Sequence, residues 1–168
     1  MSDIVFVDDF PTGYGGSEFV NKTFCDLFKI SKIQTSKESE VFNPNILYVV
    51  GNVSTMSPKG LKNLSKHPNY IILEHDYKCI QSRHPWRFDD CIIPNELKVN
   101  LNLYINAKVI FTQTEDHTEV FRKNNIKGNF ISLSSSLWSE EELQLLEELR
   151  ESSLCKSSKF CVIDSPNW

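Results

Sequence analysis

The chain alternates short runs of consecutive apolar residues with longer segments in which apolar residues recur every three or four positions. The short runs are rich in β-branched and aromatic side chains and lie at residues 4–7, 46–50, 70–73, 109–111, 130–133 and 160–164. Runs of this length without polar alternation are typical of strands that are buried on both faces of a parallel sheet. The intervening segments have the period of helices that pack one face against a core.

Polar residues next to these segments predict where the helices begin. Ser17, Thr114 and Ser139 each stand where a hydroxyl can accept a hydrogen bond from the first helical turn, and Ser57-Pro58 can start a helix because proline suits the first helical position. Glu142 follows Ser139 by three residues and completes a capping box. We therefore expect helices to follow all four positions.

Helical spacing also predicts which side chains are buried. The residues of the first helix that are expected to face the core are Phe19, Val20, Thr23, Phe24, Leu27 and Phe28. A later helix is predicted over Leu97–Ile105 from its apolar positions. His117 is expected to pack partly buried on its helix, and His67, which precedes a proline, to be an ordinary surface turn residue.

Strands that alternate with helices predict an α/β fold. The expected architecture is a Rossmann-like three-layer sandwich, in which a mostly parallel sheet lies between two layers of helices. Ligands of such folds bind beyond the carboxyl ends of the strands. The segments to inspect for function are therefore residues 8–18, 51–56, 74–88, 112–117 and 134–138.

Length and composition narrow the classes of protein. With 168 residues, 40% of them hydrophobic and 24% charged, the chain suits one soluble domain with a substantial core. A net charge of −4 argues against a role in coating nucleic acid or an anionic membrane. Five cysteines, an odd number without a Cys-x-x-Cys pair, favour reduced thiols in the cytoplasm. No stretch reaches about 18 apolar residues, so we expect no transmembrane segment.

A glycine-rich turn, Gly13-Tyr14-Gly15-Gly16-Ser17-Glu18, joins the first predicted strand to the first helix. Free N–H groups and the helix dipole favour a phosphate at such a position, and glycine lets the backbone approach a ligand closely. Glu18 stands where the dinucleotide-binding fingerprint requires its third glycine, and the lysine of a P-loop is missing. A tight turn that merely requires glycine is the alternative interpretation.

A second polar cluster follows the predicted strand at 70–73 and contains His75, Asp76 and Arg83. A histidine at a strand end can donate a hydrogen bond or act as a base, and an arginine can hold a phosphate. In the alternative interpretation, Arg83 belongs to a solvated loop and pairs with Asp89 and Asp90.

Three further features lie at the same predicted edge of the sheet. Asp8-Asp9 ends the first strand, where carboxylates can do acid–base work but more commonly bond loop amides, and we favour the structural role. Asn52 follows the strand at 46–50 and can line the same cleft. The conceivable metal ligands are His75, Asp76, Cys79 and His84. Their spacing matches no zinc pattern, so we expect no metal site.

These features resemble the N-terminal domain of GT-B glycosyltransferases, in particular the large retaining group known as group 1 or family four. Gly15-Gly16-Ser17-Glu18 is similar to the Gly-Gly-small-Glu loop of that group, and His75-Asp76 is similar to its strand-end histidine. Residues 160–168 resemble the first strand and loop of the second domain in these enzymes.

The resemblance implies a division of labour within the site. Gly15, Gly16 and Ser17 would approach the diphosphate of a UDP- or GDP-sugar donor, and His75 would bond the donor sugar or assist at the reaction centre. The residues assigned to substrate binding are Glu18, Asn52, Asp76 and Arg83. Enzymes of this group need no catalytic metal, and their C-terminal domain makes most contacts with the nucleotide.

The resemblance also predicts the organisation of the chain. Residues 1–136 would form the acceptor-side domain, 137–159 a linker helix with a polar linker, and 160–168 the start of a donor domain. The gene would then continue past Trp168, and this chain alone would be inactive. A Rossmann-like module that binds a nucleotide or a partner without catalysis is the alternative, and Glu18 disfavours a nicotinamide-dependent oxidoreductase.

Overall fold

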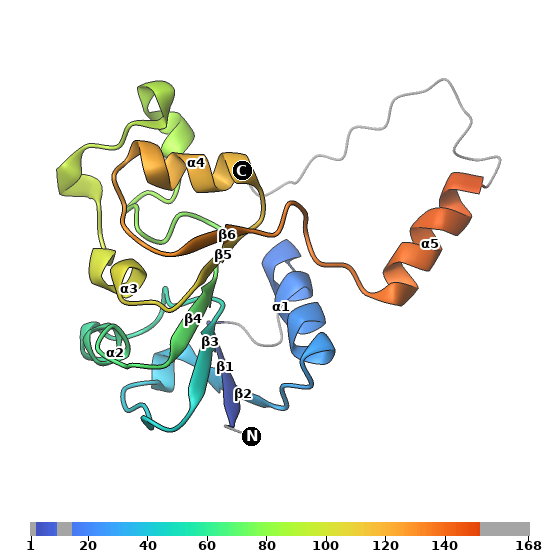
Figure 1. Cartoon of the computed structure of the whole chain (residues 1–168), viewed down its shortest axis with the longest axis horizontal. Coiled ribbons are helices and arrows are strands. Elements are labelled where there is room, and N and C mark those ends of the chain that lie inside the picture. Colours follow the sequence, from blue (N-terminus) through green and yellow to red (C-terminus); the bar gives the residue numbers. More distant parts are fainter. Residues whose placement is uncertain (1–2, 10–14, 152–168) are drawn as a thin grey trace. The chain divides into compact units, whose positions relative to one another are not determined.

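The computed structural model describes residues 3–9 and 15–151, in which six strands form one all-parallel sheet (Figure 1). The strand order is β2-β1-β3-β4-β5-β6. The strands are β1 (Ile4–Asp8), β2 (Lys32–Thr35), β3 (Leu47–Val50), β4 (Tyr70–Leu73), β5 (Ile110–Thr112) and β6 (Phe130–Ser132). The predicted α/β, Rossmann-like class is confirmed, and the described sheet is wholly rather than mostly parallel.

Five α-helices connect or follow these strands. They are α1 (Gly16–Leu27), α2 (Pro58–Leu64), α3 (Leu101–Ile105), α4 (Glu115–Lys123) and α5 (Glu140–Glu151). The chain divides into two units after Leu137, and α5 belongs to the second. The predicted linker residues 152–159 and the predicted strand 160–164 lie outside the described residues.

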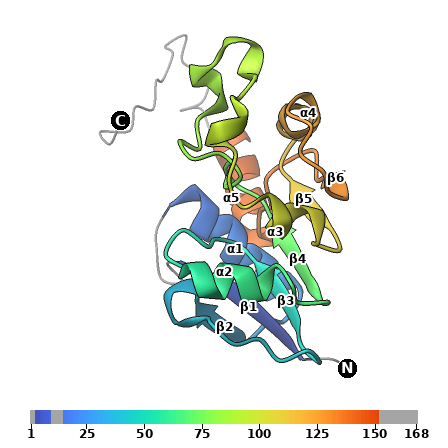
Figure 2. The same ribbon diagram turned by 90° about the vertical axis from the view of Figure 1, so that its left-hand side faces the viewer.

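The helices of the first unit cover both faces of the sheet (Figure 2). On one face, side chains of α2, α3 and α4 join sheet residues in a core whose largest members include Leu64, Tyr104 and Phe121. On the other face, Val20 and Phe24 of α1 pack on the sheet in a smaller core. The continuous apolar runs of the strands follow from this arrangement, because each central strand needs apolar side chains on both sides.

Two of the three predicted helix caps, Thr114 and Ser139, are present, and Ser57 is a further cap. The prediction for Ser17 is wrong. The hydroxyls of Ser57 and Thr114 each accept a hydrogen bond from the third helical N–H, at 3.1 Å. Ser139 forms the predicted capping box with Glu142, at 2.7 and 3.2 Å. Ser17 is not a cap, since α1 already begins at Gly16 and Gly15 is the capping residue. Glycine is accepted at this position because its backbone is extended and it needs no side-chain bond there.

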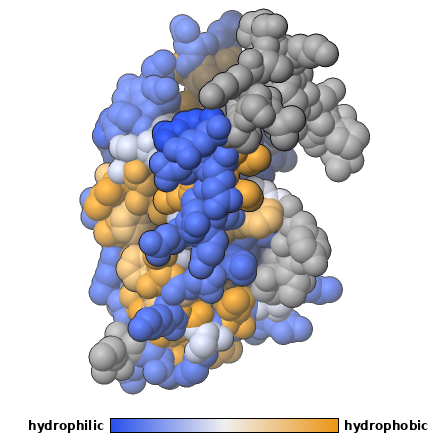
Figure 3. All heavy atoms as spheres, turned by 90° about the vertical axis from the view of Figure 1, so that its right-hand side faces the viewer, coloured by the Kyte–Doolittle hydropathy of each residue, from blue (hydrophilic) through white to orange (hydrophobic). Residues whose placement is uncertain are grey.

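The first helix is less buried than its apolar pattern predicts. Phe19, Leu27 and Phe28 were expected in the core, but they are 52%, 62% and 59% exposed. In the described structure, α1 covers only part of its face of the sheet, and an apolar hollow of about 360 Å³ lies beside its C-terminal end. Figure 3 views this side of the molecule and shows hydrophobic surface on it.

Other parts of the chain were predicted incompletely. The edge strand β2 was not predicted, and the expected helix over 97–105 forms only from Leu101 to Ile105. The chain forms a 3₁₀ turn at Asn95–Leu97, and Asn100 then adopts a left-handed conformation with φ 54° before α3 begins. His67 is buried rather than exposed, because its Nε2 contacts the Asn43 carbonyl at 2.9 Å and its Nδ1 accepts from the Asn69 N–H.

Gly51, directly after β3, has no room for a side chain. A Cβ atom there would lie 2.7 Å from the Phe6 ring and 2.9 Å from the amide nitrogen of Asn21. We expect Gly51→Ala to lower the free energy of unfolding by about 1–3 kcal/mol, measured by urea denaturation. Gly16→Ala is the matched control, because a Cβ there meets nothing within 4 Å. Equal stabilities of the two variants would contradict this steric account.

Candidate functional site

The carboxyl ends of three neighbouring strands bring most of the predicted site residues to one edge of the sheet. Asp8 ends β1 and Asp9 follows it, Asn52 follows β3, and His75 and Asp76 follow β4. They share this edge because β1, β3 and β4 are adjacent and parallel. The topology therefore assembles the candidate site from segments that are far apart in the sequence.

Asp9 organises the backbone of this edge. Its carboxylate accepts hydrogen bonds from the N–H groups of Ser54 at 2.7 Å and Thr55 at 3.0 Å. The Thr55 hydroxyl donates at 2.9 Å, and the Ser36 hydroxyl donates as well. Burial opposes the charge of Asp9, but these four donors outweigh it and lower the pKa of the carboxyl. Asp9 thus has the structural role that the sequence favoured, which is to hold the loop after β3.

Asp8 and His75 are connected through Asn21 of α1. The Asn21 amide nitrogen donates to the Asp8 carboxylate at 2.7 Å, and the Asn21 amide oxygen lies 2.6 Å from Nε2 of His75. The second Asp8 oxygen accepts from the Asp9 N–H at 2.8 Å. Burial raises the pKa of the Asp8 carboxyl, and the hydrogen bond from Asn21 opposes that effect. Asn21 was not among the predicted site residues.

His75 is held in its neutral form. Burial lowers its pKa to about 3, and the positive charge of Lys78 acts in the same direction. Its other ring nitrogen, Nδ1, is buried and has no hydrogen-bond partner among the described residues. At neutral pH this imidazole can donate one hydrogen bond and accept one, but it carries no charge.

The residue before His75 forms a buried ion pair on the opposite side of the strand. The Glu74 carboxylate is fully buried, accepts from Lys78 Nζ at 2.9 Å and also accepts from the Tyr104 hydroxyl. Burial raises the pKa of Glu74, whereas the charge of Lys78 opposes that rise. Lys78 also lies 3.3 Å from Asp76, so its ammonium connects the core to the sheet edge.

Arg83 is bound within the protein rather than projecting freely. Its guanidinium donates to Asp76 at 2.9 Å and to the Ser54 hydroxyl. Burial opposes the charge of Asp76, but Lys78 and Arg83 together lower the pKa of its carboxyl. The alternative in which Arg83 pairs with Asp89 and Asp90 does not occur.

The described half of the glycine turn lies at the start of α1. A Cβ atom on Gly15 would collide with Oε2 of Glu18, so the Glu18 carboxylate folds back over Gly15. The charge of Glu18 also contributes to the raised pKa of Asp8. Gly13 and Tyr14 lie outside the described residues. Asn52 turns toward its own loop, where its side-chain oxygen accepts from the Val53 N–H and the Ser54 hydroxyl at 3.1 Å.

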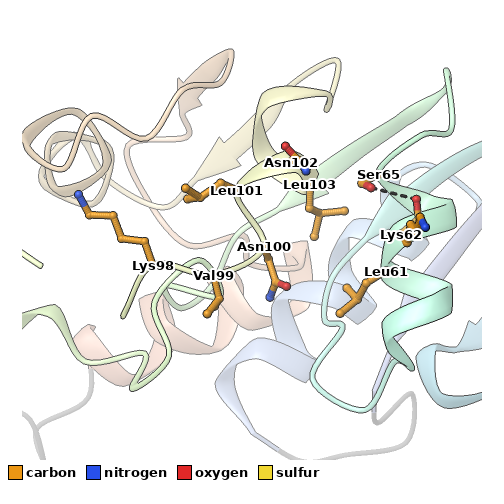
Figure 4. Close-up of a pocket in the computed structure, with 9 residues that line it drawn as sticks. All are labelled: Leu61, Lys62, Ser65, Lys98, Val99, Asn100, Leu101, Asn102 and Leu103. Carbon is orange, nitrogen blue, oxygen red and sulfur yellow. Dashed lines mark hydrogen bonds between the residues drawn. The ribbon is translucent and has the colours of Figure 1, made fainter. Parts of the chain in front are cut away.

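A separate hollow of about 440 Å³ lies between the end of α2 and the segment that leads into α3 (Figure 4). Residues that line it include Lys62, Ser65, Lys98 and Asn100. The Ser65 hydroxyl is bonded to the Lys62 carbonyl at 3.0 Å, and Lys98 Nζ donates to Asn95 and to the Asn124 carbonyl. The hollow holds none of the predicted site residues, so it is not part of the candidate site.

Residues 3–9 and 15–151 contain neither a cluster of metal ligands nor a membrane-spanning helix. No three His, Cys, Asp or Glu side chains are grouped so that they could hold a metal ion. Within the same residues, the helices are too short or too polar to cross a membrane.

The fold and site define a Rossmann-like α/β domain with a polar edge at its strand ends. The chain matches no protein-family model, no curated protein and no solved structure.

The buried Glu74–Lys78 pair predicts an asymmetry between two lysine substitutions. Lys78→Met leaves Glu74 buried without its counter-ion, and we expect the free energy of unfolding to fall by about 3–5 kcal/mol. Lys59→Met breaks an exposed pair with Glu40 and should leave the denaturation midpoint nearly unchanged. Urea denaturation of both variants measures the difference. A Lys78→Met protein as stable as Lys59→Met would contradict the importance of the buried pair.

The two neutral histidines predict a loss of stability in mild acid. Burial lowers the pKa of His75 to about 3 and that of His117 to about 4. An unfolded histidine titrates near 6.5, so the unfolded chain binds more protons between these values and stability falls as the pH falls. From pH 7 to pH 5 we expect a loss of about 1–2 kcal/mol for each histidine.

His117→Gln removes one titrating group and should make this pH dependence shallower. The exposed Lys123→Ala variant is the control and should keep the wild-type slope. Urea denaturation at several pH values measures it, and identical slopes for wild type and His117→Gln would show that His117 is not neutral in the fold.

Proposed function

We propose that this chain forms the N-terminal, acceptor-side part of a retaining glycosyltransferase. The enzyme transfers a sugar from a UDP- or GDP-sugar to an acceptor without a catalytic metal. Its active protein includes a second, donor-binding domain, and it works in the cytoplasm. The proposal derives from the resemblance of the glycine turn and the strand-end histidine to that group of enzymes.

The observation that carries the proposal is the position of His75 relative to α1. His75 lies at the carboxyl end of a central strand, and Asn21 ties it to the helix that begins with the glycine turn. Asn21 lies one turn after Ser17 on that helix, so the two features that carry the resemblance belong to the same part of the sheet edge. Ligands of open parallel sheets bind at this kind of edge.

The neutral state of His75 suits a role in hydrogen bonding. In sugar transfer, the bond between the anomeric carbon and the diphosphate oxygen breaks. The acceptor oxygen bonds to that carbon, and the acceptor proton passes to the departing diphosphate oxygen. A histidine with a pKa of about 3 is a poor proton donor at neutral pH. We therefore assign His75 to the orientation of a sugar hydroxyl rather than to acid catalysis.

A binding module without catalysis is the competing function. The paired Arg83 and the neutral His75 are compatible with a site that holds a nucleotide or a polar partner and releases it unchanged. Turnover distinguishes the two functions, because both predict binding and only the enzyme predicts release of UDP or GDP.

The test uses the complete protein encoded by the gene, incubated with a panel of UDP- and GDP-sugars. We expect release of the nucleoside diphosphate from at least one donor and a loss of about a hundredfold in kcat for His75→Ala, because the sugar is then oriented less precisely. Lys123→Ala, an exposed substitution on α4, should keep wild-type activity. Release of UDP or GDP is measured by chromatography.

Two results would contradict parts of this proposal. Binding of a donor without turnover would favour the module, and turnover that survives His75→Ala would remove His75 from the mechanism. Folding of each variant is checked by circular dichroism, so that a loss of activity is not confused with a loss of structure.

A further inference from the structure

Three polar side chains, Asp8, Asn21 and His75, form a line of hydrogen bonds that connects the end of β1 through α1 to the end of β4. Asp8 and Asn21 are buried, and His75 is partly buried, so each group depends on the others to satisfy its hydrogen-bonding capacity. The distances are 2.7 Å from the Asn21 amide nitrogen to Asp8 and 2.6 Å from the Asn21 amide oxygen to His75 Nε2.

The direction of the hydrogen bonds in this line follows from the chemistry of its first member. An ionised carboxylate only accepts, so the Asn21 side chain must present its NH₂ group to Asp8. The Asp9 N–H donates to the second Asp8 oxygen at 2.8 Å, which the ionised form accepts equally well. The Asn21 carbonyl oxygen therefore faces His75, and the nitrogen opposite it must carry a proton.

This direction selects one tautomer of the neutral imidazole. With its proton on Nε2, His75 has a lone pair on Nδ1, which is buried and has no partner among the described residues. A buried acceptor left without a donor is unfavourable. A ligand that brings an O–H group to Nδ1 would remove that cost.

We propose that Asn21 is a positioning residue: held by Asp8, it fixes His75 in the Nε2–H tautomer and leaves Nδ1 as the acceptor for a ligand hydroxyl. The assignment of that hydroxyl to a sugar rests on the proposed function. The assignment of the tautomer rests only on the three side chains.

A reversed line is the competing arrangement. If Asp8 were protonated, it would donate to the Asn21 oxygen, and the Asn21 NH₂ would donate to His75 Nε2. His75 would then carry its proton on Nδ1 and offer the ligand a donor. The two arrangements place a single proton on different nitrogens of one ring, so a spectroscopic measurement separates them.

The experiment is nitrogen-15 NMR of the full chain with labelled histidine, at pH 7 and without ligand. The His75 signals are assigned by their loss in His75→Gln. We expect a protonated Nε2 whose hydrogen is protected from exchange, and an unprotonated Nδ1. A proton on Nδ1 in the wild-type protein overturns the proposal.

Two variants test the part played by Asn21. In Asn21→Leu, the Hε2 proton of His75 loses its acceptor and should exchange about tenfold faster or more. Val20→Ala, the adjacent buried position on α1, perturbs the packing but leaves the line intact, so its exchange rate should stay at the wild-type value. Equal rates in wild type and Asn21→Leu overturn the positioning role.

The ligand is tested by adding UDP- and GDP-sugars to the complete protein. A bound donor that bonds Nδ1 should shift the Nδ1 signal and leave Nε2 protonated. A donor that binds without moving Nδ1 overturns the acceptor role. If no donor binds, the ligand assignment fails together with the proposed function, while the spectrum without ligand still decides whether Asn21 sets the tautomer.

Discussion

The burial of Glu74 determines how the end of β4 faces the candidate site. The Glu74 N–H still donates to the Phe111 carbonyl at 2.8 Å, so the chain stays extended beyond the strand. Lys78 and Tyr104 hold the Glu74 carboxylate on the side of the sheet that α3 covers. Successive side chains of an extended chain point to opposite faces, so His75 is directed toward α1. The Glu74–Lys78 ion pair and the hydrogen bonds from His75 through Asn21 to Asp8 therefore both depend on the two consecutive residues that follow β4.

Charged groups at this edge also fix the loops that surround it. The Asp9 carboxylate fixes the loop after β3 by accepting hydrogen bonds from two of its backbone N–H groups. Arg83 bonds both Asp76 and the Ser54 hydroxyl of the same loop. A buried carboxylate is stable only when donors replace the water it loses, so each loop is bound where a carboxylate needs it. Charged side chains of the protein itself thus fix the loops at this edge without a ligand.

The fold could be predicted from the sequence because its strands are buried on both faces and therefore carry continuous apolar runs. The same criterion missed β2, an edge strand of four residues, Lys32–Thr35, in which polar and apolar residues alternate. His75 could be placed at a strand end, but Asn21 could not be found. The partners of Asn21 are Asp8 and His75, which lie at the ends of two strands far away in the sequence. The helical pattern around Asn21 carries no information about them. The burial of His67 was missed for the same reason, since its ring contacts the backbone carbonyl of Asn43, which is distant in the sequence.

The internal use of charge at this edge constrains what a ligand can find there. Arg83 is already paired with Asp76, so its positive charge is compensated. The Glu18 carboxylate lies over Gly15 and places a negative charge at the start of α1. His75 adds no charge, because burial lowers its pKa to about 3. What the edge offers is a set of neutral donors and acceptors with fixed directions. Such groups suit the hydroxyls of a sugar, whereas a diphosphate is bound best where positive charge or free helix N–H groups face it. In a two-domain transferase this would assign the described edge to the sugar and acceptor, and the diphosphate largely to the second domain.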